Sequence, residues 1–205
     1  MKKMIGFTLI ELLIVVAIIA ILAAIAIPNF LEAQVRSKVS RCRADMRTTL
    51  TALESYGVDY TKYPPMGDNN VDPITTGFHA RVPNHLTTPL AYMTALTYDP
   101  FVAKSSTWSS STYPIATRVG ERYAYFNVKF LYDHPTWGAS WRANELESRA
   151  GAHLIYGYGP DKDPFNWGAR TMTPYDPTNG TVSAGNIIRT QRHTEGIGPR
   201  SDGTW

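Results

Sequence analysis

The chain has 205 residues, which is enough for one domain with a real core, and its formal net charge of +3 is too small to argue for nucleic-acid binding. Its single cysteine, Cys42, excludes an internal disulfide and any cysteine-based metal cluster. Aromatic residues make up 12% of the chain and are mostly tyrosine. Together with the glycine and proline content, this composition favours a loop-rich body that contains β-structure.

The first predicted element is an apolar helix from Phe7 to Ile27. Its residues from Leu12 onward are all apolar, and about 20 helical residues cross the hydrocarbon core of a bilayer. A simple signal anchor and a secretory signal peptide cut near Ala24-Ile25-Ala26 are two possible interpretations. Secretory apolar regions run about 7–15 residues and do not usually carry a carboxylate. Glu11 stands inside this run, which argues against the signal peptide.

A third interpretation explains Glu11. A short basic leader with Lys2 and Lys3 is followed by Gly6-Phe7-Thr8-Leu9-Ile10-Glu11. This motif closely resembles the N-terminal signal of type IV pilins and type II secretion pseudopilins. The resemblance implies that a membrane prepilin peptidase cuts between Gly6 and Phe7 and that the new amine of Phe7 is methylated. Pro28, at the end of the apolar run, also lies where these proteins commonly have a proline.

A lone carboxylate such as Glu11 is costly at bilayer depth. Cleavage would create a positive amine at Phe7, and two opposite charges offset part of each other's desolvation. The resemblance implies that Glu11 meets the Phe7 amine of a neighbouring subunit in a helical filament. The alternative is a bond from Glu11 to its own first helical turn, where free N–H groups favour acidic side chains.

The basic residues on the two sides of the apolar run predict a different membrane orientation from the one that the resemblance implies. Upstream there are only Lys2 and Lys3, whereas five follow downstream: Arg36, Lys38, Arg41, Arg43 and Arg47. The positive-inside count alone would leave the body in the cytoplasm. The resemblance implies a single-pass protein of the bacterial inner membrane with a periplasmic body, and we follow it because the cleavage signal is more specific. The basic residues could contact acidic phospholipid, contact a neighbouring subunit or face solvent.

Beyond Pro28 the sequence predicts that the helix continues as an amphipathic rod. Pro28 itself predicts a kink or a melted turn, and Gly57 predicts the end of the helix. Apolar residues recur at steps of three or four, and we expect them to pack on a sheet: Leu31, Val35, Val39, Cys42, Met46, Leu50, Leu53 and Tyr56.

The remainder is predicted as a connecting region, 57–120, with a short helix at Thr88–Leu96. Its YTKYPPMG resembles the connection after the long helix of major pseudopilins. Three strands are expected at 121–132, 152–159 and 182–190, with a short helix within 136–149. The fold class is therefore α+β and pilin-like, with a long N-terminal helix on a small antiparallel sheet. The predicted division is leader 1–6, transmembrane half 7–29, amphipathic half 30–56, connection 57–120 and sheet with C-terminal loops 121–205.

One stretch, GYGPDKDPFNWG, resembles the calcium-binding loop of major pseudopilins. Asp161 lies where that loop has an aspartate, although Lys162 stands where a glycine is expected. Turn formation is the alternative explanation for the aspartates and asparagines here. The possible oxygen donors for calcium are Asp161, Asp163, Asp176, Asn179 and Asn186.

The sequence contains no G-x-S-x-G elbow, P-loop or HExxH motif, and its histidines have no zinc-ligand spacing. We therefore expect a non-enzymatic filament subunit, most similar to a major pseudopilin of a type II secretion system. Its expected partners are further copies, other pseudopilins, the prepilin peptidase and the inner-membrane assembly platform. The alternatives are a type IV pilin or minor pilin for adhesion, motility or DNA uptake, and a membrane-anchored extracytoplasmic hydrolase or binding protein.

Overall fold

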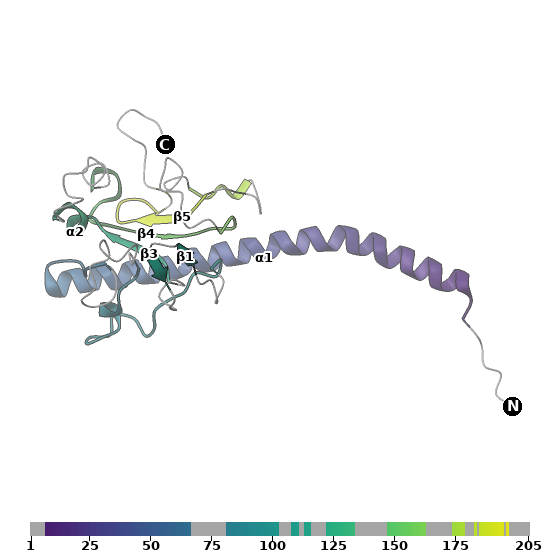
Figure 1. Ribbon diagram of the computed structural model, residues 1–205, viewed down its shortest axis with the longest axis horizontal. Coiled ribbons are helices and arrows are strands. Elements are labelled where there is room, and N and C mark those ends of the chain that lie inside the picture. Colours follow the sequence, from purple (N-terminus) through teal and green to yellow (C-terminus); the bar gives the residue numbers. More distant parts are fainter. Residues whose placement is uncertain are drawn as a thin grey trace.

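The computed structural model describes residues 7–66, 81–102, 108–110, 113–115, 122–133, 147–162, 174–178, 183, 185–194 and 196. Figure 1 shows a long helical rod with the rest of the chain gathered beside its C-terminal half. The elements in chain order are α1 (Leu9–Tyr60), η1 (Asn84–Leu86), β1 (Trp108–Ser110), β2 (Tyr113–Ile115), β3 (Ala124–Asn127), α2 (Val128–Asp133), β4 (His153–Gly157) and β5 (Ile187–Thr190).

The helix α1 is a single element of 52 residues that passes through Pro28. A proline removes one backbone N–H, but intact turns on both sides can hold the helical path. The melted turn expected at Pro28 is therefore wrong, and the rod bows gently along its length (Figure 1). A kink of the axis at Pro28 stays a prediction.

The C-terminal end of α1 also differs from the expectation. Gly57 is helical, and the helix ends at Tyr60, after which Thr61 adopts a left-handed conformation with φ 54°. Gly57 has a packing reason instead. A Cβ there would come 3.0 Å from the ring of Tyr63, so the missing side chain lets Tyr63 lie against the helix.

The two halves of α1 have opposite surroundings. Every large apolar side chain from Phe7 to Leu31 is exposed, with exposed fractions from 45% at Val15 to 81% at Leu9. In the described part of the chain, α1 is the helix that is long and apolar enough to cross a membrane, judged by length and composition. The C-terminal half has one buried face, which consists of Val39, Cys42, Met46, Thr49, Ala52, Leu53 and Tyr56.

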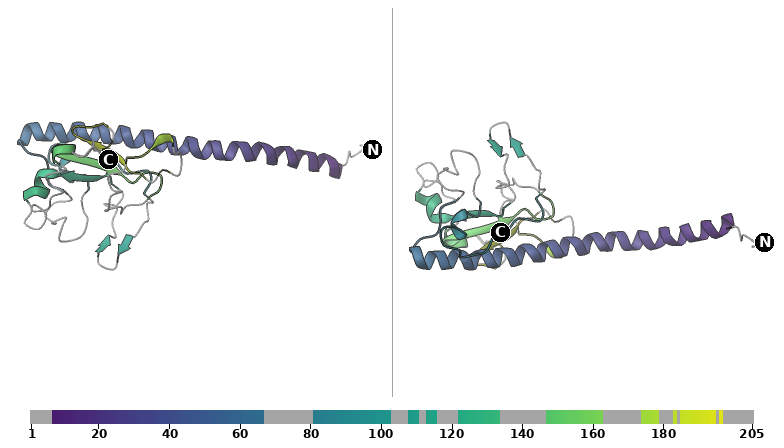
Figure 2. Two further views of the ribbon diagram at one scale, coloured as in Figure 1. Left: turned by 90° about the horizontal axis from the view of Figure 1, so that it is seen from above. Right: turned by 90° about the horizontal axis from the view of Figure 1, so that it is seen from below.

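The buried face confirms the predicted stripe from Val39 upward, and Val35 and Leu50 pack partly against it. Leu31 is 52% exposed and belongs with the apolar half, so its place in the stripe is wrong. Both views of Figure 2 show the body on one side of α1, which explains why only one helical face is buried.

The strands β3, β4 and β5 form an antiparallel sheet in that order. Tyr125, Ile155 and Ile187 join the buried face of α1 in the main hydrophobic core. Leu154, Tyr156 and Ile188, on the alternate positions, form a second cluster on the opposite face. This is the predicted α+β arrangement, a long N-terminal helix on a small antiparallel sheet. The hairpin of β1 and β2 projects from the body (Figure 2).

The first predicted strand, 121–132, is too long, because β3 ends at Asn127 and α2 follows at once. The Asn127 Oδ1 atom accepts a hydrogen bond from the backbone N–H of Phe130 at 3.0 Å, which caps the new helix. Its Nδ2 donates to the carbonyl oxygen of Pro64 at 3.0 Å. The other two strands are confirmed within narrower bounds, as β4 and β5.

The short helix predicted at Thr88–Leu96 is wrong. The structure has the single 3₁₀ turn η1 and then a closed loop, in which the backbone N–H groups of Tyr92 and Met93 both donate to the Leu86 carbonyl. Pro89 disfavours a helical conformation at the preceding residue, which explains the loop. Of the stretch 136–149, the structure describes only 147–149, which are helical together with residue 150.

A buried carboxylate joins the connecting region to the sheet. Asp99 is 4% exposed and accepts backbone hydrogen bonds from Phe101 at 2.9 Å and Tyr158 at 2.7 Å. Burial raises the pKa of Asp99, and these N–H groups oppose the rise. The Sγ atom of Cys42 lies 4.0 Å from its Oδ1. Burial and the nearby Asp99 raise the pKa of the Cys42 thiol to about 12, so Cys42 is an inert core residue, as predicted.

A buried histidine lies where β4 meets the end of α1. His153 is fully buried, its Nε2 lies 3.6 Å from Glu54 Oε1, and neither ring nitrogen has a hydrogen-bond partner. Its ring packs edge-on against Tyr63, whose hydroxyl donates to Glu54 Oε2 at 2.8 Å. Burial lowers the pKa of His153 to about 4, and Glu54 offsets part of this effect.

We expect the free energy of unfolding to decrease as the pH falls from 6.5 toward 4. The folded protein keeps His153 neutral down to about pH 4, whereas the unfolded chain takes up this proton near pH 6.5. The unfolded state therefore binds more protons in this window, and the loss approaches about 3 kcal/mol at its acid end. Urea unfolding of detergent-extracted protein measures it. The variant His153→Phe should lose this part of the pH dependence; equal pH dependence in both proteins would contradict the assignment.

Candidate functional site

The N-terminal end of α1 carries a closed hydrogen-bond ring between Thr8 and Glu11. Glu11 Oε2 accepts from the Thr8 backbone N–H at 2.8 Å and from the Thr8 hydroxyl at 2.6 Å, and the Thr8 hydroxyl oxygen accepts from the Glu11 N–H at 3.3 Å. This is a capping box, which satisfies two N–H groups that a helix start leaves open. It explains why the helix begins directly after Thr8.

The capping box is the intramolecular alternative considered for Glu11. Both hydrogen bonds from Thr8 converge on Oε2, so Oε1 lies outside the ring and can accept a further donor. Phe7 next to it is 71% exposed, and Gly6 lies outside the described residues. Thr8 was missed as a site residue, although the spacing Thr-x-x-Glu is a known sequence signal for a capping box.

Asp161, Asp176 and Asn186, the proposed calcium donors that the structure describes, lie in segments that meet beside the start of β5. A Cβ at Gly159 would overlap the carbonyl oxygen of Gly185. Pro174 and Asn186 form a parallel bridge, and the Tyr175 N–H donates to the Asn186 carbonyl at 2.8 Å. The tight backbone contacts thus bring the segments 158–162, 174–178 and 185–186 together.

Only three of the five proposed donors lie among the described residues. Asp161 and Asp176 are exposed and Asn186 is buried, while Asp163 and Asn179 lie outside the described residues. Asp176 Oδ1 already accepts from the Thr178 hydroxyl and N–H, which hold the pKa of Asp176 below its usual value. Among the described residues, no three histidine, cysteine, aspartate or glutamate side chains form a metal-binding group. The calcium site stays a prediction.

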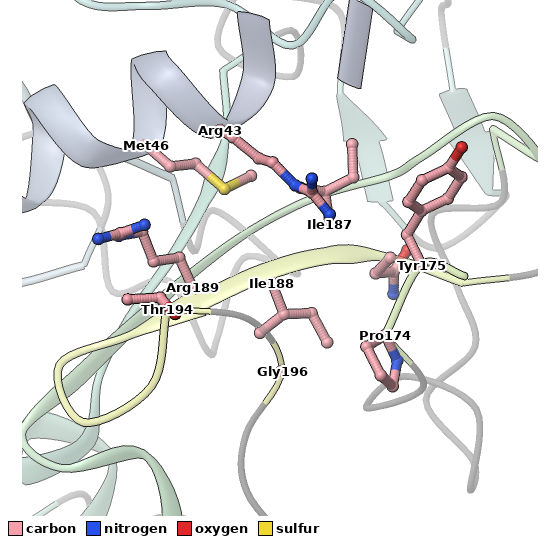
Figure 3. A pocket seen from close by; sticks show the side chains of 10 residues that line it. Arg43, Met46, Pro174, Tyr175, Ile187, Ile188, Arg189, Thr194 and Gly196 are labelled. Atoms are coloured by element: carbon pink, nitrogen blue, oxygen red, sulfur yellow. The ribbon is translucent and has the colours of Figure 1, made fainter. Parts of the chain in front are cut away.

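Next to these loops, a pocket of about 240 Å³ opens between α1 and β5. Figure 3 shows Arg43 and Met46 reaching into it from α1, with Ile187 and Arg189 opposite on β5. The lining contains neither a carboxylate nor a histidine nor a cysteine. Among the described residues, the pocket offers two guanidinium groups, the Tyr175 phenol and the Thr194 hydroxyl, a set without a recognisable catalytic arrangement.

Comparison with known proteins concerns mainly the N-terminal part. Residues 1–27 match the prokaryotic N-terminal methylation motif. The chain is similar to the type IV major pilin protein PilA of Myxococcus xanthus, with 55% identity over 58 residues, 28% of this chain and 26% of the relative. It is also similar to a probable minor fimbrial protein of Dichelobacter nodosus, with 46% identity over 77 residues, 38% of this chain and 48% of the relative.

A third relative is the type IV wide pilus major component PilA4 of Thermus thermophilus, with 48% identity over 63 residues, 31% of this chain and 48% of the relative. The chain thus spans from about a quarter to about half the length of these relatives. No solved structure matches. The expected resemblance of the N-terminal part to type IV pilins, with its methylation motif, is confirmed. These relatives are named pilins and fimbrial proteins, not enzymes and not pseudopilins.

If calcium binds near Asp161, it should stabilise the folded protein. A ligand that binds only the folded state contributes about 2.7 kcal/mol at a hundredfold excess over its Kd. Full-length protein in detergent should then melt at a higher temperature in calcium than in chelator. Asp161→Ala should abolish the difference, whereas Asp59→Ala, at the far end of α1, should preserve it. Equal melting temperatures for the unsubstituted protein in calcium and in chelator would remove the calcium hypothesis.

Proposed function

We propose that the chain is a structural subunit of a type IV pilus-like filament, held in the inner membrane by α1 before assembly. The observation that carries this proposal is the half-helix from Phe7 to Leu31, whose large apolar side chains are all exposed. Exposed apolar surface of this extent is stable only in lipid or against other apolar helices. Lipid covers it in the precursor, and the α1 helices of neighbouring copies cover it in the filament.

The named relatives favour a pilus over the secretion pseudopilus that we first expected. The major pilins, which include the wide pilus component, and the minor fimbrial protein support a pilin or minor pilin. The pseudopilin alternative is supported by the resemblance of YTKYPPMG and of the loop at Asp161 to segments of major pseudopilins. Immunolabelling for this chain tests the choice, because a pilin forms filaments that extend from the cell surface.

In this proposal the prepilin peptidase cuts after Gly6 and the amine of Phe7 is methylated. The body lies on the periplasmic side, and the inner-membrane assembly platform adds the subunit to the filament. Glu11 then accepts a hydrogen bond from the Phe7 amine of a neighbouring subunit. The free Oε1 atom makes this contact compatible with the capping box, since the Thr8 bonds occupy only Oε2. The pair also offsets the cost of burying either charge alone.

We expect the mature chain to begin at Phe7 and to carry a methylated amine, because Gly6-Phe7 precedes the long apolar helix. N-terminal mass analysis of membrane-extracted protein measures both properties. Gly6→Val should leave the full-length precursor, because a bulky side chain replaces the glycine at the cut. A mature terminus at Ile27 would instead establish a secretory signal peptide.

The role of Glu11 can be separated from helix capping by two variants. Thr8→Val removes the hydroxyl of the capping box and should cost about 1 kcal/mol. Glu11→Leu also leaves the neighbour's amine buried without a partner, which typically costs 3–5 kcal/mol at each subunit contact. We expect assembly to fail in Glu11→Leu and to persist in Thr8→Val.

The measurement is cross-linking between engineered cysteines on adjacent α1 helices in a Cys42→Ser background, with cleavage followed on the same gel. Cleavage should be normal in both variants because the cut lies upstream of both changes. Equal cross-linked ladders in Glu11→Leu and in the unsubstituted protein would refute the amine contact. Equal failure of the two variants would assign Glu11 to capping alone.

A further inference from the structure

The C-terminal half of α1, which follows the apolar run, is charged unevenly along its length. Residues 32–47 contain five basic and two acidic side chains, a formal charge of +3 that equals the net charge of the whole chain. Residues 48–60 contain Glu54 and Asp59 and no basic residue. The positive end of this half is the end that adjoins the apolar run. Three of its basic residues lie nearest to that run and are called the basic collar here: Arg36, Lys38 and Arg41.

The collar lies within reach of a lipid headgroup layer. A hydrocarbon core of about 30 Å takes about 20 helical residues, and its polar layers add roughly 5–7 Å on each side. The last exposed apolar residue of the run is Leu31. At 1.5 Å per residue, Arg36 stands about 7.5 Å above Leu31, Lys38 about 10 Å and Arg41 about 15 Å. Long basic side chains extend their charged ends toward a nearby interface, which shortens these distances.

The collar side chains are accessible. The side chains of Arg36 and Arg41 are 69% and 70% exposed. Arg36 Nη2 lies 2.6 Å from Glu32 Oε1, and Arg41 Nε lies 3.7 Å from Asp45 Oδ2. Such exposed ion pairs on one helix are worth only about 0.3–0.5 kcal/mol, so a phosphate can compete with the carboxylate.

The third member of the collar, Lys38, reaches the body. Its Nζ lies 5.7 Å from the centre of the Phe101 ring, in a segment whose backbone is held by Asp99. Lys38 and Arg36 are two residues apart, so they point to different sides of α1. The collar thus surrounds the helix rather than lining one stripe, and part of it touches the base of the body.

We propose that Arg36, Lys38 and Arg41 bind the phosphate groups of anionic phospholipids and thereby set the height and tilt of the body above the bilayer. The inference rests on the membrane-spanning part of the proposed function. Juxtamembrane basic residues gain about 1 kcal/mol each near an anionic surface, and the attraction extends over about one Debye length, 8–10 Å. The collar adjoins the apolar run, which makes lipid the nearest source of negative charge outside its own chain.

A second copy of the chain fits the collar less well. The acidic residues of α1 beyond the collar already serve their own subunit. Asp45 Oδ2 lies 3.7 Å from Arg41 Nε and accepts from the Tyr123 hydroxyl at 3.1 Å. Farther along the helix, Tyr63 donates to Glu54 at 2.8 Å, and Tyr92 donates to Asp59 at 2.6 Å. Both lie about 20 Å or more above Arg41 at the helical rise. A neighbour would have to be displaced along the rod by that distance to bring its acidic end to the collar.

The test uses the full chain with Ser40→Cys and Cys42→Ser, labelled at position 40 with a spin label. The protein is reconstituted into vesicles of phosphatidylcholine alone or mixed with phosphatidylglycerol, and the depth of the label relative to the headgroups is measured. Because Ser40 is exposed and lies one turn from Arg36, its label reports the height of the collar. We expect the label to lie closer to the headgroups in the anionic vesicles and this shift to disappear at high salt.

In anionic vesicles, the label is divided between a position close to the headgroups and a position farther away. The ratio of the close to the distant population should fall by at least about tenfold in the triple variant Arg36→Gln, Lys38→Gln and Arg41→Gln. Arg47→Gln, about 16 Å above Arg36, is the matched control and should keep most of the shift. Equal label depth in both lipids, or a shift unchanged by the triple substitution, would overturn the inference. So would a shift that follows protein density instead of lipid charge, because it would identify a second copy as the partner. Failure of the chain to insert at all would overturn the proposed membrane anchor as well.

Discussion

The dominant physical constraint is that one continuous helix is built for two different surroundings. From Phe7 to Leu31 no described part of the body covers the helix, and its large apolar side chains are exposed. From Val39 onward the same helix forms one wall of the core. The rod cannot bury its first half by folding back, because α1 stays helical through Pro28. The first half must therefore be covered from outside the chain, first by lipid and, in the proposed filament, by other copies.

The body depends on the second half of the rod for its core, and few regular elements help. The sheet has three short strands, and one of its faces packs on α1. Side chains from irregular segments complete the contacts: Asp99 binds the backbone beyond β4, and Asn127 binds the segment that follows α1. Each of these buried polar groups is satisfied by backbone partners far away in the sequence. Such bonds fix loop positions that a small apolar core alone would leave undefined.

Periodicity predicted the elements that bury a regular face. The apolar run and the stripe from Val39 onward follow from spacing, and the strands β4 and β5 follow from the residue types of their segments. The failures arise where a tertiary contact decides the local structure. The end of β3 depends on the bonds of Asn127 to Phe130 and Pro64, and Gly57 lies inside α1 where the ring of Tyr63 leaves little room for a side chain. The pairing of Thr8 with Glu11 follows from the spacing Thr-x-x-Glu.

The basic residues on the two sides of the apolar run also bear on the conflict between the positive-inside count and the proposed orientation. In the sequence, Lys2 and Lys3 precede the apolar run and the basic collar follows it. Cleavage after Gly6 would remove both lysines and leave a single amine close to Glu11, so the cytoplasmic end would become nearly neutral. The collar would remain positive, and the electrostatic hold on the mature helix would then lie almost entirely on the side of the body. Under the proposed function, leader removal would thus weaken the attachment that opposes withdrawal of α1 from the bilayer, and this would give a physical reason for processing to precede assembly.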